Sequence, residues 1–334
     1  MSHDHLTLEL VSSHLDAHYA LTGRVVRLPG EHDENYLVTT PGARFVFRVV
    51  ARGQDSSRST FILSLLQHLA ASDIRAPRIV PTSDSEATAD IPDADGVSRV
   101  SWLATYVEGA PFLEHLGDPL VCSEVGRALA RLDLHLATAP TPKDPGSTPW
   151  DLTRPQGALA LIDGVPLRGE DDRIRRYLHD LVDTTVPAMA QLDRQPIHND
   201  ANPDNVLLGS DGVIGMIDFG DALVAPRVVE LAVAGSYLVA EGHPSNAHSP
   251  VTSLIRSYGE ISPVSELEAS LLPSLMRGRI ALAMGNACAR AFHHPERADY
   301  VLRHFDRARQ RLDALEAWDQ ATAATAWTTS EGTG

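Results

Sequence analysis

The spacing of apolar residues changes once along the chain, and this change constrains the fold more than any other feature. In about the first hundred residues, apolar and polar side chains alternate, as strands buried on one face require. The alternating apolar residues are Tyr36, Val38, Phe45, Phe47 and Val49. After Gly109 the spacing becomes helical, with apolar residues three or four apart. That second pattern is clear at Val125, Leu129, Leu132 and Leu136.

This change of period predicts an α+β protein with two lobes. We expect a small antiparallel-sheet lobe over residues 1–106 and a larger helical lobe over residues 107–320, with a hinge near residues 106–109. A length of 334 residues is comfortable for two domains. Within the first lobe, helical spacing predicts helices near residues 6–19 and 57–72. The tail 321–334 is expected to be disordered, because it is short of large apolar residues.

The charge balance bears on possible partners. There are 44 Asp and Glu residues against 28 Lys and Arg, for a formal net charge of −16. Nucleic acid and anionic membrane surfaces need a basic footprint, so neither is expected as a partner. An acidic cleft suits a cationic ligand such as an amine, although an acidic surface can also serve solubility alone. The balance leaves the oligomeric state open.

The two cysteines and the N-terminus point to a cytoplasmic protein. Cys122 and Cys288 lie far apart in helical-looking segments, so buried thiols are more plausible than a disulfide or a metal site. The first ten residues lack the basic and apolar regions of a signal peptide. No apolar run reaches the length of a membrane span.

One polar segment stands out in the second lobe. Residues 198–205 read His-Asn-Asp-Ala-Asn-Pro-Asp-Asn, and Pro203 makes a helix there unlikely. Two short apolar runs follow, joined by Ser-Asp-Gly, and these predict a hairpin of two strands. Because both strands rise by about 3.3 Å per residue, Asn205 at the entry and Asp218 at the exit should meet at one end, with Asp200 beside them.

Residue types in this segment favour phosphoryl transfer. A carboxylate and an amide oxygen suit Mg²⁺ held together with substrate phosphates, and Asp200 is then placed to accept a proton. His198, Asp200 and Asn205, followed by Asp218-Phe219-Gly220, reproduce the order H-x-D-x₄-N…D-F-G of kinases. The alternative of a calcium loop is weaker, since the D-x-D-x-D-G spacing is absent.

The segment after Asp218 restricts the kind of molecule that can accept the phosphoryl group. Only Ala-Leu-Val-Ala separates Asp221 from Pro226, a favourable residue for a helix start, and an apolar helix follows. A peptide platform of the protein-kinase kind does not fit in that space. The acceptor of the phosphoryl group is therefore expected to be a small molecule.

These motifs resemble the aminoglycoside phosphotransferase/choline kinase superfamily, and most closely its hydroxylysine kinase-like branch. The stretches that carry the resemblance are residues 126–137, 149–152, 197–208, 215–234 and 271–284, and it spans about residues 20–315. It implies a bilobal protein-kinase-like fold and transfer of a nucleotide γ-phosphate to a hydroxyl.

The same resemblance implies roles for individual residues. Asp200 would be the base, Asn205 and Asp218 would hold Mg²⁺, and His198 would brace the catalytic loop. Glu230, in an apolar helix, would support that loop. The base of ATP or GTP would be held by the backbone near Thr105, Tyr106 and Val107, in the nucleotide-binding first lobe.

The first lobe departs from the family pattern. Arg48 stands where the family has a lysine on its third strand, and the predicted helix 57–72 lacks the carboxylate that usually pairs with it. Arg48 is still expected to contact phosphates and to pair with an acid elsewhere, of which Asp218 is one candidate. The turn that runs from Leu28 to Asn35, with Gly30 as its only glycine, is expected to cover the phosphates.

Two acceptors and one rival function remain open. Asp221 and Asp204 are expected to receive an amine of the acceptor, which is either a hydroxylysine-like amino acid or an aminoglycoside or nucleoside antibiotic inactivated in self-resistance. The rival is a nucleotide-binding pseudokinase that acts as a binding or regulatory module. The intact set of Asp200, Asn205 and Asp218 disfavours that rival.

Overall fold

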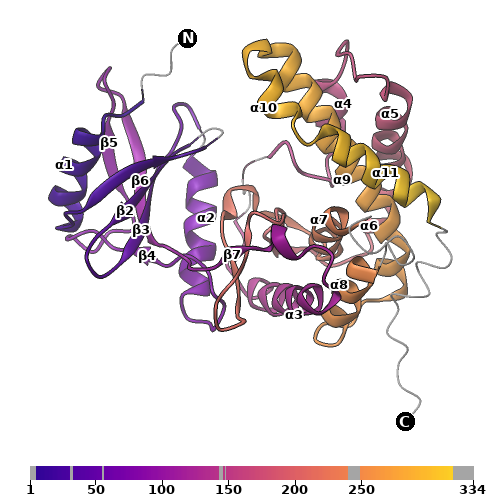
Figure 1. Ribbon diagram of the computed structural model, residues 1–334, viewed down its shortest axis with the longest axis horizontal. Coiled ribbons are helices and arrows are strands. Elements are labelled where there is room, and N and C mark those ends of the chain that lie inside the picture. Colours follow the sequence, from indigo (N-terminus) through magenta and orange to yellow (C-terminus); the bar gives the residue numbers. More distant parts are fainter. Residues whose placement is uncertain are drawn as a thin grey trace. The chain divides into compact units, whose positions relative to one another are not determined.

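The structure is a computed structural model that describes residues 5–30, 33–54, 56–142, 146, 148–239 and 249–318 (Figure 1). The chain divides into two compact units. Unit 1 comprises Met1–Glu108 with Pro142–Gly146, and unit 2 comprises Gly109–Thr141 with Ser147–Gly334. The tail expected to be disordered, 321–334, lies outside the described residues.

Unit 1 is a six-stranded antiparallel sheet with two helices. The strands follow the order β1-β2-β3-β6-β4, and β5 also pairs with β6. Their bounds are β1 Arg24–Leu28, β2 Glu34–Thr39, β3 Arg44–Val49, β4 Ile79–Val80, β5 Ala89–Pro92 and β6 Ser98–Thr105. The helices are α1 Leu8–Tyr19 and α2 Ser56–Leu69. The expected small antiparallel-sheet lobe is confirmed.

Alternation along the strands gives this sheet two apolar faces. Tyr36, Phe47 and Leu103 are fully or almost fully buried on one face, against Val11 and Leu15 of α1. On the other face Trp102 and Ala104 pack with Leu63 of α2. The same alternation that predicted the strands therefore places one helix on each face. Figure 1 shows the sheet between α1 and α2.

Unit 2 is mainly helical. Its principal helices are α3 Pro119–Leu136, α4 Gln156–Leu161, α5 Asp171–Asp180, α6 Val186–Met189, α7 Val228–Leu238, α8 Ser249–Gly259, α9 Glu266–His293, α10 Ala298–Leu302 and α11 Phe305–Ala317. Short 3₁₀ turns cover Phe112–His115, Phe219–Asp221 and Pro295–Arg297, and a π-helical turn, Leu181–Thr185, joins α5 to α6.

The longest helix, α9, contacts most of the other helices of unit 2. It starts at a capping box, in which Ser265 and Glu268 each bond to the other's backbone N–H. Its middle is buried, including Met276, Arg279 and Met284. A helix covered on all sides in this way can present a buried charged residue to the interior of the unit, and Arg279 is such a residue.

Five short strands complete unit 2. β9 Val206–Leu208 and β10 Ile214–Met216 form the predicted hairpin, with β7 Ala110–Pro111 added beside β9. β8 Gln195–Ile197 pairs with β11 Leu223–Ala225 in a separate antiparallel ribbon. The sequence did not predict this ribbon, since three residues are too few to show a period.

Candidate active site

Two strand pairs bring the polar segment 198–205 and the segment 218–221 together. In the ribbon, Ile197 stands opposite Leu223. In the hairpin, the N–H of Ile217 donates to the carbonyl of Asn205 over 2.9 Å. His198 therefore leaves one strand pair and Asn205 enters the other, so the loop between them is held at both ends. The expected meeting of Asn205 and Asp218 at one end of the hairpin is confirmed for the backbone.

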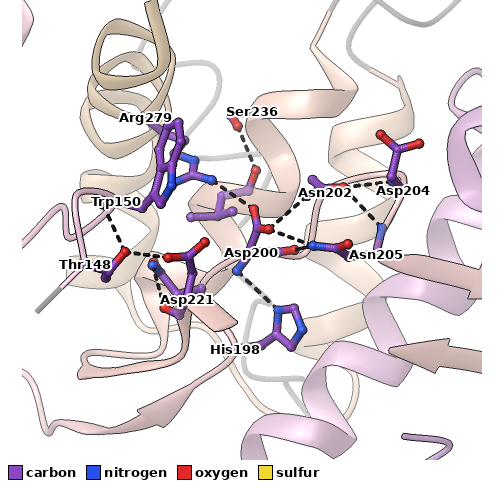
Figure 2. Close-up of polar contacts among 12 residues, drawn as sticks. Thr148, Trp150, His198, Asp200, Asn202, Asp204, Asn205, Asp221, Ser236 and Arg279 are labelled. Atoms are coloured by element: carbon purple, nitrogen blue, oxygen red, sulfur yellow. Dashed lines mark hydrogen bonds and ion pairs between the residues drawn. The ribbon is translucent and has the colours of Figure 1, made fainter. Parts of the chain in front are cut away.

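Asp200 is the centre of the site (Figure 2). Its Oδ2 accepts hydrogen bonds from the side-chain amides of Asn202, at 3.0 Å, and Asn205, at 2.6 Å. Its Oδ1 accepts from Nη2 of Arg279 at 3.1 Å. The carboxylate side chain is 16% exposed. Three donors from two elements thus fix its orientation, while part of it remains open to a ligand.

Burial dominates the acidity of Asp200. It raises the pKa of this carboxyl to about 8; the nearby Asp221 and Asp218 also raise it, whereas Arg279 and the bond from Asn202 lower it. A carboxylate in this setting is a stronger base than an exposed one. A bound cation would add to the effect of Arg279 and favour the ionised form.

His198 and Glu230 hold the backbone of the loop 198–205 through hydrogen bonds. The imidazole is fully buried, with Nε2 2.9 Å from the carbonyl of Ile217 and Nδ1 3.2 Å from the N–H of Asp200. A backbone N–H can only donate and a carbonyl can only accept, so Nδ1 is the acceptor and Nε2 carries the hydrogen. Glu230 of α7 accepts the N–H of Asn199 at 2.8 Å, and burial raises its pKa.

The loop needs this support because its backbone is unusual. Asn199 has φ +62° and Asp218 has φ +58°, both in the left-handed region that L residues visit rarely. The ring of Phe219 meets His198 edge-on at 4.5 Å between centroids. The packing of these two rings and the bond to Glu230 therefore offset the strain near the carboxylates of Asp200 and Asp218.

The fit of Asn205 and Asp218 to a cation can be tested on their hydrogen bonds. The amide nitrogen of Asn205 is committed to Asp200, through its carbonyl at 3.0 Å and its carboxylate. The oxygen Oδ1 of Asn205 thus faces the other way and is the atom a cation would use. Asp218 accepts the N–H of Gly220 through Oδ1. One amide oxygen and one carboxylate suit Mg²⁺ bound jointly with phosphate oxygens.

No group of three His, Cys, Asp or Glu side chains within the described residues is arranged to hold a metal alone. None of the helices in the described part of the chain is long and apolar enough to cross a membrane.

The two predicted acceptor-binding acids differ in position. Asp221 lies near Asp200 and Arg279, and its Oδ1 accepts the hydroxyl of Thr148. Asp204 is exposed, and Figure 2 shows its carboxylate directed away from Asp200. Its backbone N–H bonds to Oδ1 of Asn202 at 2.8 Å and so closes the turn. Of the two acids, Asp221 is therefore the better placed to contact an acceptor.

Arg48 has an acidic partner inside unit 1. Its Nε donates to Oδ2 of Asp33 at 2.7 Å, and its guanidinium lies 5.7 Å from the ring centre of Trp102. Asp33 also accepts the N–H of Ala51 at 2.9 Å. Asp33, in the turn before β2, was not foreseen as the partner. The helix α2 offers none, because its sequence from Ser56 to Leu69 contains no Asp or Glu.

The other predicted nucleotide-binding residues lie around the same sheet. Asn35 stands opposite Arg48 in the β2–β3 register. A Cβ at Gly30 would come within 2.6 Å of the carbonyl oxygen of Asp33, so the turn requires glycine there. The rest of that turn, Glu31 and His32, lies outside the described residues.

Three further predicted residues lie at the end of β6 and directly after it. The N–H groups of Thr105 and Tyr106 already bond to the carbonyls of Arg78 and Arg44, at 2.9 and 3.1 Å. A nucleotide base would therefore have to use the N–H of Val107 or a carbonyl of this segment.

Sequence reasoning missed Arg279 and Asn202, which both bond to Asp200. The sequence feature that could have indicated Arg279 is its position within the mainly apolar segment 275–284, where a charged residue is unusual. The ring of Trp150 lies over the guanidinium of Arg279, with 4.7 Å between the guanidinium carbon and the ring centre. The side-chain Nδ2 of Asn286 in α9 donates to the backbone carbonyl of Pro149, the residue before Trp150, at 3.2 Å.

Several known proteins are similar to this chain. Homoserine kinase of Brucella anthropi is 29% identical over 262 residues, which are 75% of this chain and 73% of the relative. Homoserine kinase of Gluconobacter oxydans is 27% identical over 260 residues, 75% and 76% of the two chains. The identity is spread over most of both proteins.

Solved structures show the same fold. A microcompartment-associated aminopropanol kinase aligns with a TM-score of 0.67 at 20% identity, covering 94% of this chain and 98% of its own. An amicoumacin kinase solved with AMP-PNP and Ca²⁺ gives a TM-score of 0.69 at 13% identity, covering 95% and 93%. At these identities the likeness establishes the α+β kinase-like fold.

A family match adds what the structures alone do not. The model of the phosphotransferase enzyme family called APH matches residues 24–259, more than half of the chain. This range includes the loop of Asp200 and the segment of Asp218. The chain therefore belongs to this phosphotransferase enzyme family, within the aminoglycoside phosphotransferase/choline kinase superfamily, and is a small-molecule phosphotransferase.

Proposed function

We propose that this phosphotransferase moves the γ-phosphate of ATP or GTP to a hydroxyl of a small, amine-bearing acceptor, with Asp200 as the general base. The observation that carries the proposal is the set of hydrogen bonds around Asp200. Asn202, Asn205 and Arg279 orient a partly open carboxylate, and burial raises its pKa. A purely structural aspartate has no need to remain open on one side.

The reaction assigns a task to each group. The acceptor oxygen attacks the γ-phosphorus, its proton passes to a carboxylate oxygen of Asp200, and the bond from phosphorus to the bridging oxygen of the nucleoside diphosphate breaks. A positioned base of this kind contributes about 10²–10⁴-fold to the rate. His198 and Glu230 hold the loop backbone and do not touch the reacting atoms.

Oδ1 of Asn205 and the carboxylate of Asp218 would hold Mg²⁺, which neutralises negative charge on the phosphates when bound. Their side chains leave most of the coordination to phosphate oxygens and water, as Mg²⁺ prefers. Arg48 is assigned to the nucleotide phosphates, with Asp33 fixing its direction. Since guanidinium remains charged and presents two parallel donors, it can bind phosphate in place of lysine.

Two observations support an amine on the acceptor. Asp221 places a carboxylate near Asp200, and it can attract a cationic group. The relatives are homoserine kinases and an aminopropanol kinase, and both of those acceptors combine an amine with a hydroxyl. An antibiotic acceptor is the second candidate, favoured by the fold shared with an amicoumacin kinase and a spectinomycin phosphotransferase.

The test is transfer from labelled ATP and GTP to a panel of hydroxyl compounds. The panel contains homoserine, hydroxylysine, 3-aminopropan-1-ol, aminoglycosides, nucleoside antibiotics and neutral sugars. We expect labelled product with an amine-bearing compound and dependence on a divalent cation. A neutral sugar as the best acceptor would contradict the amine. Nucleotide binding without transfer to any compound would favour the pseudokinase.

A further inference from the structure

Arg279 carries unused hydrogen-bonding capacity at the site of Asp200. The residue is 2% exposed, and its Nη2 donates to Oδ1 of Asp200. Its Nε and Nη1 are buried and have no hydrogen-bond partner. A guanidinium presents five N–H donors, so most of them are unsatisfied here. A buried donor left without a partner destabilises the folded state, and more so when it is charged.

The surroundings keep this cation in place and shielded from water. Trp150 covers one face of the guanidinium at 4.7 Å, an arrangement in which the ring attracts the cation. The guanidinium also hydrogen-bonds with the phenol of Tyr237 in α7, and the carboxylate of Asp221 is close enough to stabilise its charge. Figure 2 shows Arg279 between Trp150 and Asp200. The group is therefore rigid, charged and dry, which are the conditions under which arginine binds an anion strongly.

Asp200 alone does not explain this arrangement. Its bond to Arg279 is single, and its other oxygen is taken by Asn202 and Asn205. A guanidinium that holds a carboxylate frequently forms two parallel bonds to it, and Arg279 forms one. The donors that remain are suited to a second carboxylate, supplied by a ligand at Asp200.

We propose that Arg279 binds a carboxylate of the acceptor, so that the preferred acceptor is a small hydroxy amino acid. This inference rests on the proposed function and adds the group that selects among amine-bearing alcohols. Arg279 takes the carboxylate, Asp221 takes the amine and Asp200 takes the hydroxyl proton. The bond from Thr148 occupies Oδ1 of Asp221, which leaves Oδ2 for the amine.

A zwitterion also fits the charges better than a purely cationic acceptor does. Arg279 would repel an added amine, whereas Asp221 would repel an added carboxylate. An acceptor with both groups on one carbon satisfies the two residues together. Although the net charge of the whole chain is −16, this site contains a buried cation, Arg279, which can bind an anionic group.

The test compares two acceptors that differ only by the carboxylate. Homoserine and 3-aminopropan-1-ol share the hydroxyl, the amine and the carbon spacing between them. We expect the wild type to favour homoserine in kcat/KM by about 10²-fold or more, because a site built for a hydrogen-bonding group rejects the analogue that lacks it. Hydroxylysine and its decarboxylated diamine form a second pair for the same comparison.

Variants separate recognition from positioning. Arg279→Gln should slow transfer to both acceptors, because Asp200 loses one of its orienting bonds, but it should lower kcat/KM for homoserine about 10²-fold more than for 3-aminopropan-1-ol. Arg279→Lys should recover part of the preference for homoserine. Arg277→Gln is the matched control, since Arg277 is buried in the same helix but donates to the carbonyl of Leu315. It should leave the ratio of the two acceptors unchanged.

Equal losses with both acceptors in Arg279→Gln would overturn the inference, because that result shows that Arg279 only positions Asp200. A wild type that prefers the acceptor without a carboxylate would overturn it as well.

A binding measurement tests the inference even if the variants fail to fold or the wild type transfers phosphate to none of the acceptors. Calorimetry on the wild type with nucleotide and Mg²⁺ compares 2-aminobutyrate with propylamine, neither of which has a hydroxyl. Tighter binding of 2-aminobutyrate, by about tenfold or more, supports the carboxylate site even without transfer. Equal or weaker binding contradicts it. Failure of transfer to all acceptors counts against the proposed function instead.

Discussion

The N–H of Ile217 donates to the carbonyl of Asn205 over 2.9 Å, and this bond closes the end of the β9–β10 hairpin. It places Asp218, the next residue, beside Asn205, although the two are separated by the whole hairpin in sequence. The two proposed cation ligands are thereby positioned by main-chain geometry rather than by a flexible loop. Residues on paired strands are held more accurately than residues on free loops.

Asp218→Asn should abolish metal-dependent transfer. The amide keeps the size of the side chain but removes the charge that attracts Mg²⁺. The measurement is turnover across a Mg²⁺ titration, together with nucleotide affinity at each metal concentration. Asp211→Asn is the control, because Asp211 lies at the opposite end of the same hairpin, where its Oδ1 accepts the local N–H of Val213 in the turn. Wild-type turnover in Asp218→Asn would remove this residue from the cation site.

Asp200→Asn should reduce kcat by about 10²–10⁴-fold while nucleotide binding is retained, since the amide cannot accept the hydroxyl proton. Asn is chosen over Ala because it preserves the shape that Asn205 and Arg279 contact. Turnover and nucleotide affinity are measured on the same preparation. A variant with full activity would mean that another group, or the phosphate itself, takes the proton.

The sequence predicted those parts of the fold that depend on local spacing. The alternation at Tyr36 and Phe47 predicted the sheet of unit 1, and Pro203 with the turn at Asp211 predicted the hairpin. These predictions are confirmed because each depends on contacts between residues close in the chain. The break between α10 and α11 was not predicted, since the helical spacing continues across it.

Contacts between distant segments could not be predicted in this way. Arg279 meets Asp200 only because α9 packs beside the loop, and no periodic pattern shows which helix lies where. The pairing of Arg48 with Asp33 depends on the path of the turn before β2. The residue types of the site were thus visible in the sequence, whereas the partners that tune them were not.

Arg48→Lys tests whether the guanidinium is functional. If Arg48 uses two parallel donors on the nucleotide phosphates, lysine should raise the KM for nucleotide rather than restore the family pattern. Arg24→Lys, on the exposed start of β1, controls for the general effect of the exchange. An unchanged nucleotide KM in both Arg48→Lys and Arg48→Ala would show that a different residue binds the phosphates.

Glu230→Gln should be tolerated better than Glu230→Ala. The amide oxygen of glutamine can still accept the N–H of Asn199, whereas alanine leaves that buried donor unsatisfied at a cost of about 1–3 kcal/mol. We expect Glu230→Ala to lower both the melting temperature and kcat, with nucleotide KM little changed. Thermal unfolding and steady-state kinetics on the two variants provide the comparison. Equal stability of the two variants would show that the bond to Asn199 contributes little.

His14 should make unit 1 sensitive to mild acid. Burial in the core, with His18 beside it, lowers the pKa of His14 from 6.5 to about 4, and its Nε2 lies 3.3 Å from the hydroxyl of Ser101. Below pH 6.5 His14 therefore binds a proton in the unfolded chain but not in the folded unit. The free energy of unfolding consequently falls as the pH is lowered from 6.5 toward 4.

The pKa shift of His14 also sets the size of this loss of stability. From pH 6.5 to 5 the loss attributable to His14 should reach about 2 kcal/mol at most, at 1.36 kcal/mol per pH unit. Glu34, whose pKa is lowered, adds its own loss only below its unfolded value of 4.5, outside this window. Amide hydrogen exchange in β3 and β6 measures the stability of unit 1, and His14→Gln should abolish this part of its pH dependence. The same slope in His14→Gln would assign the acid sensitivity to another group.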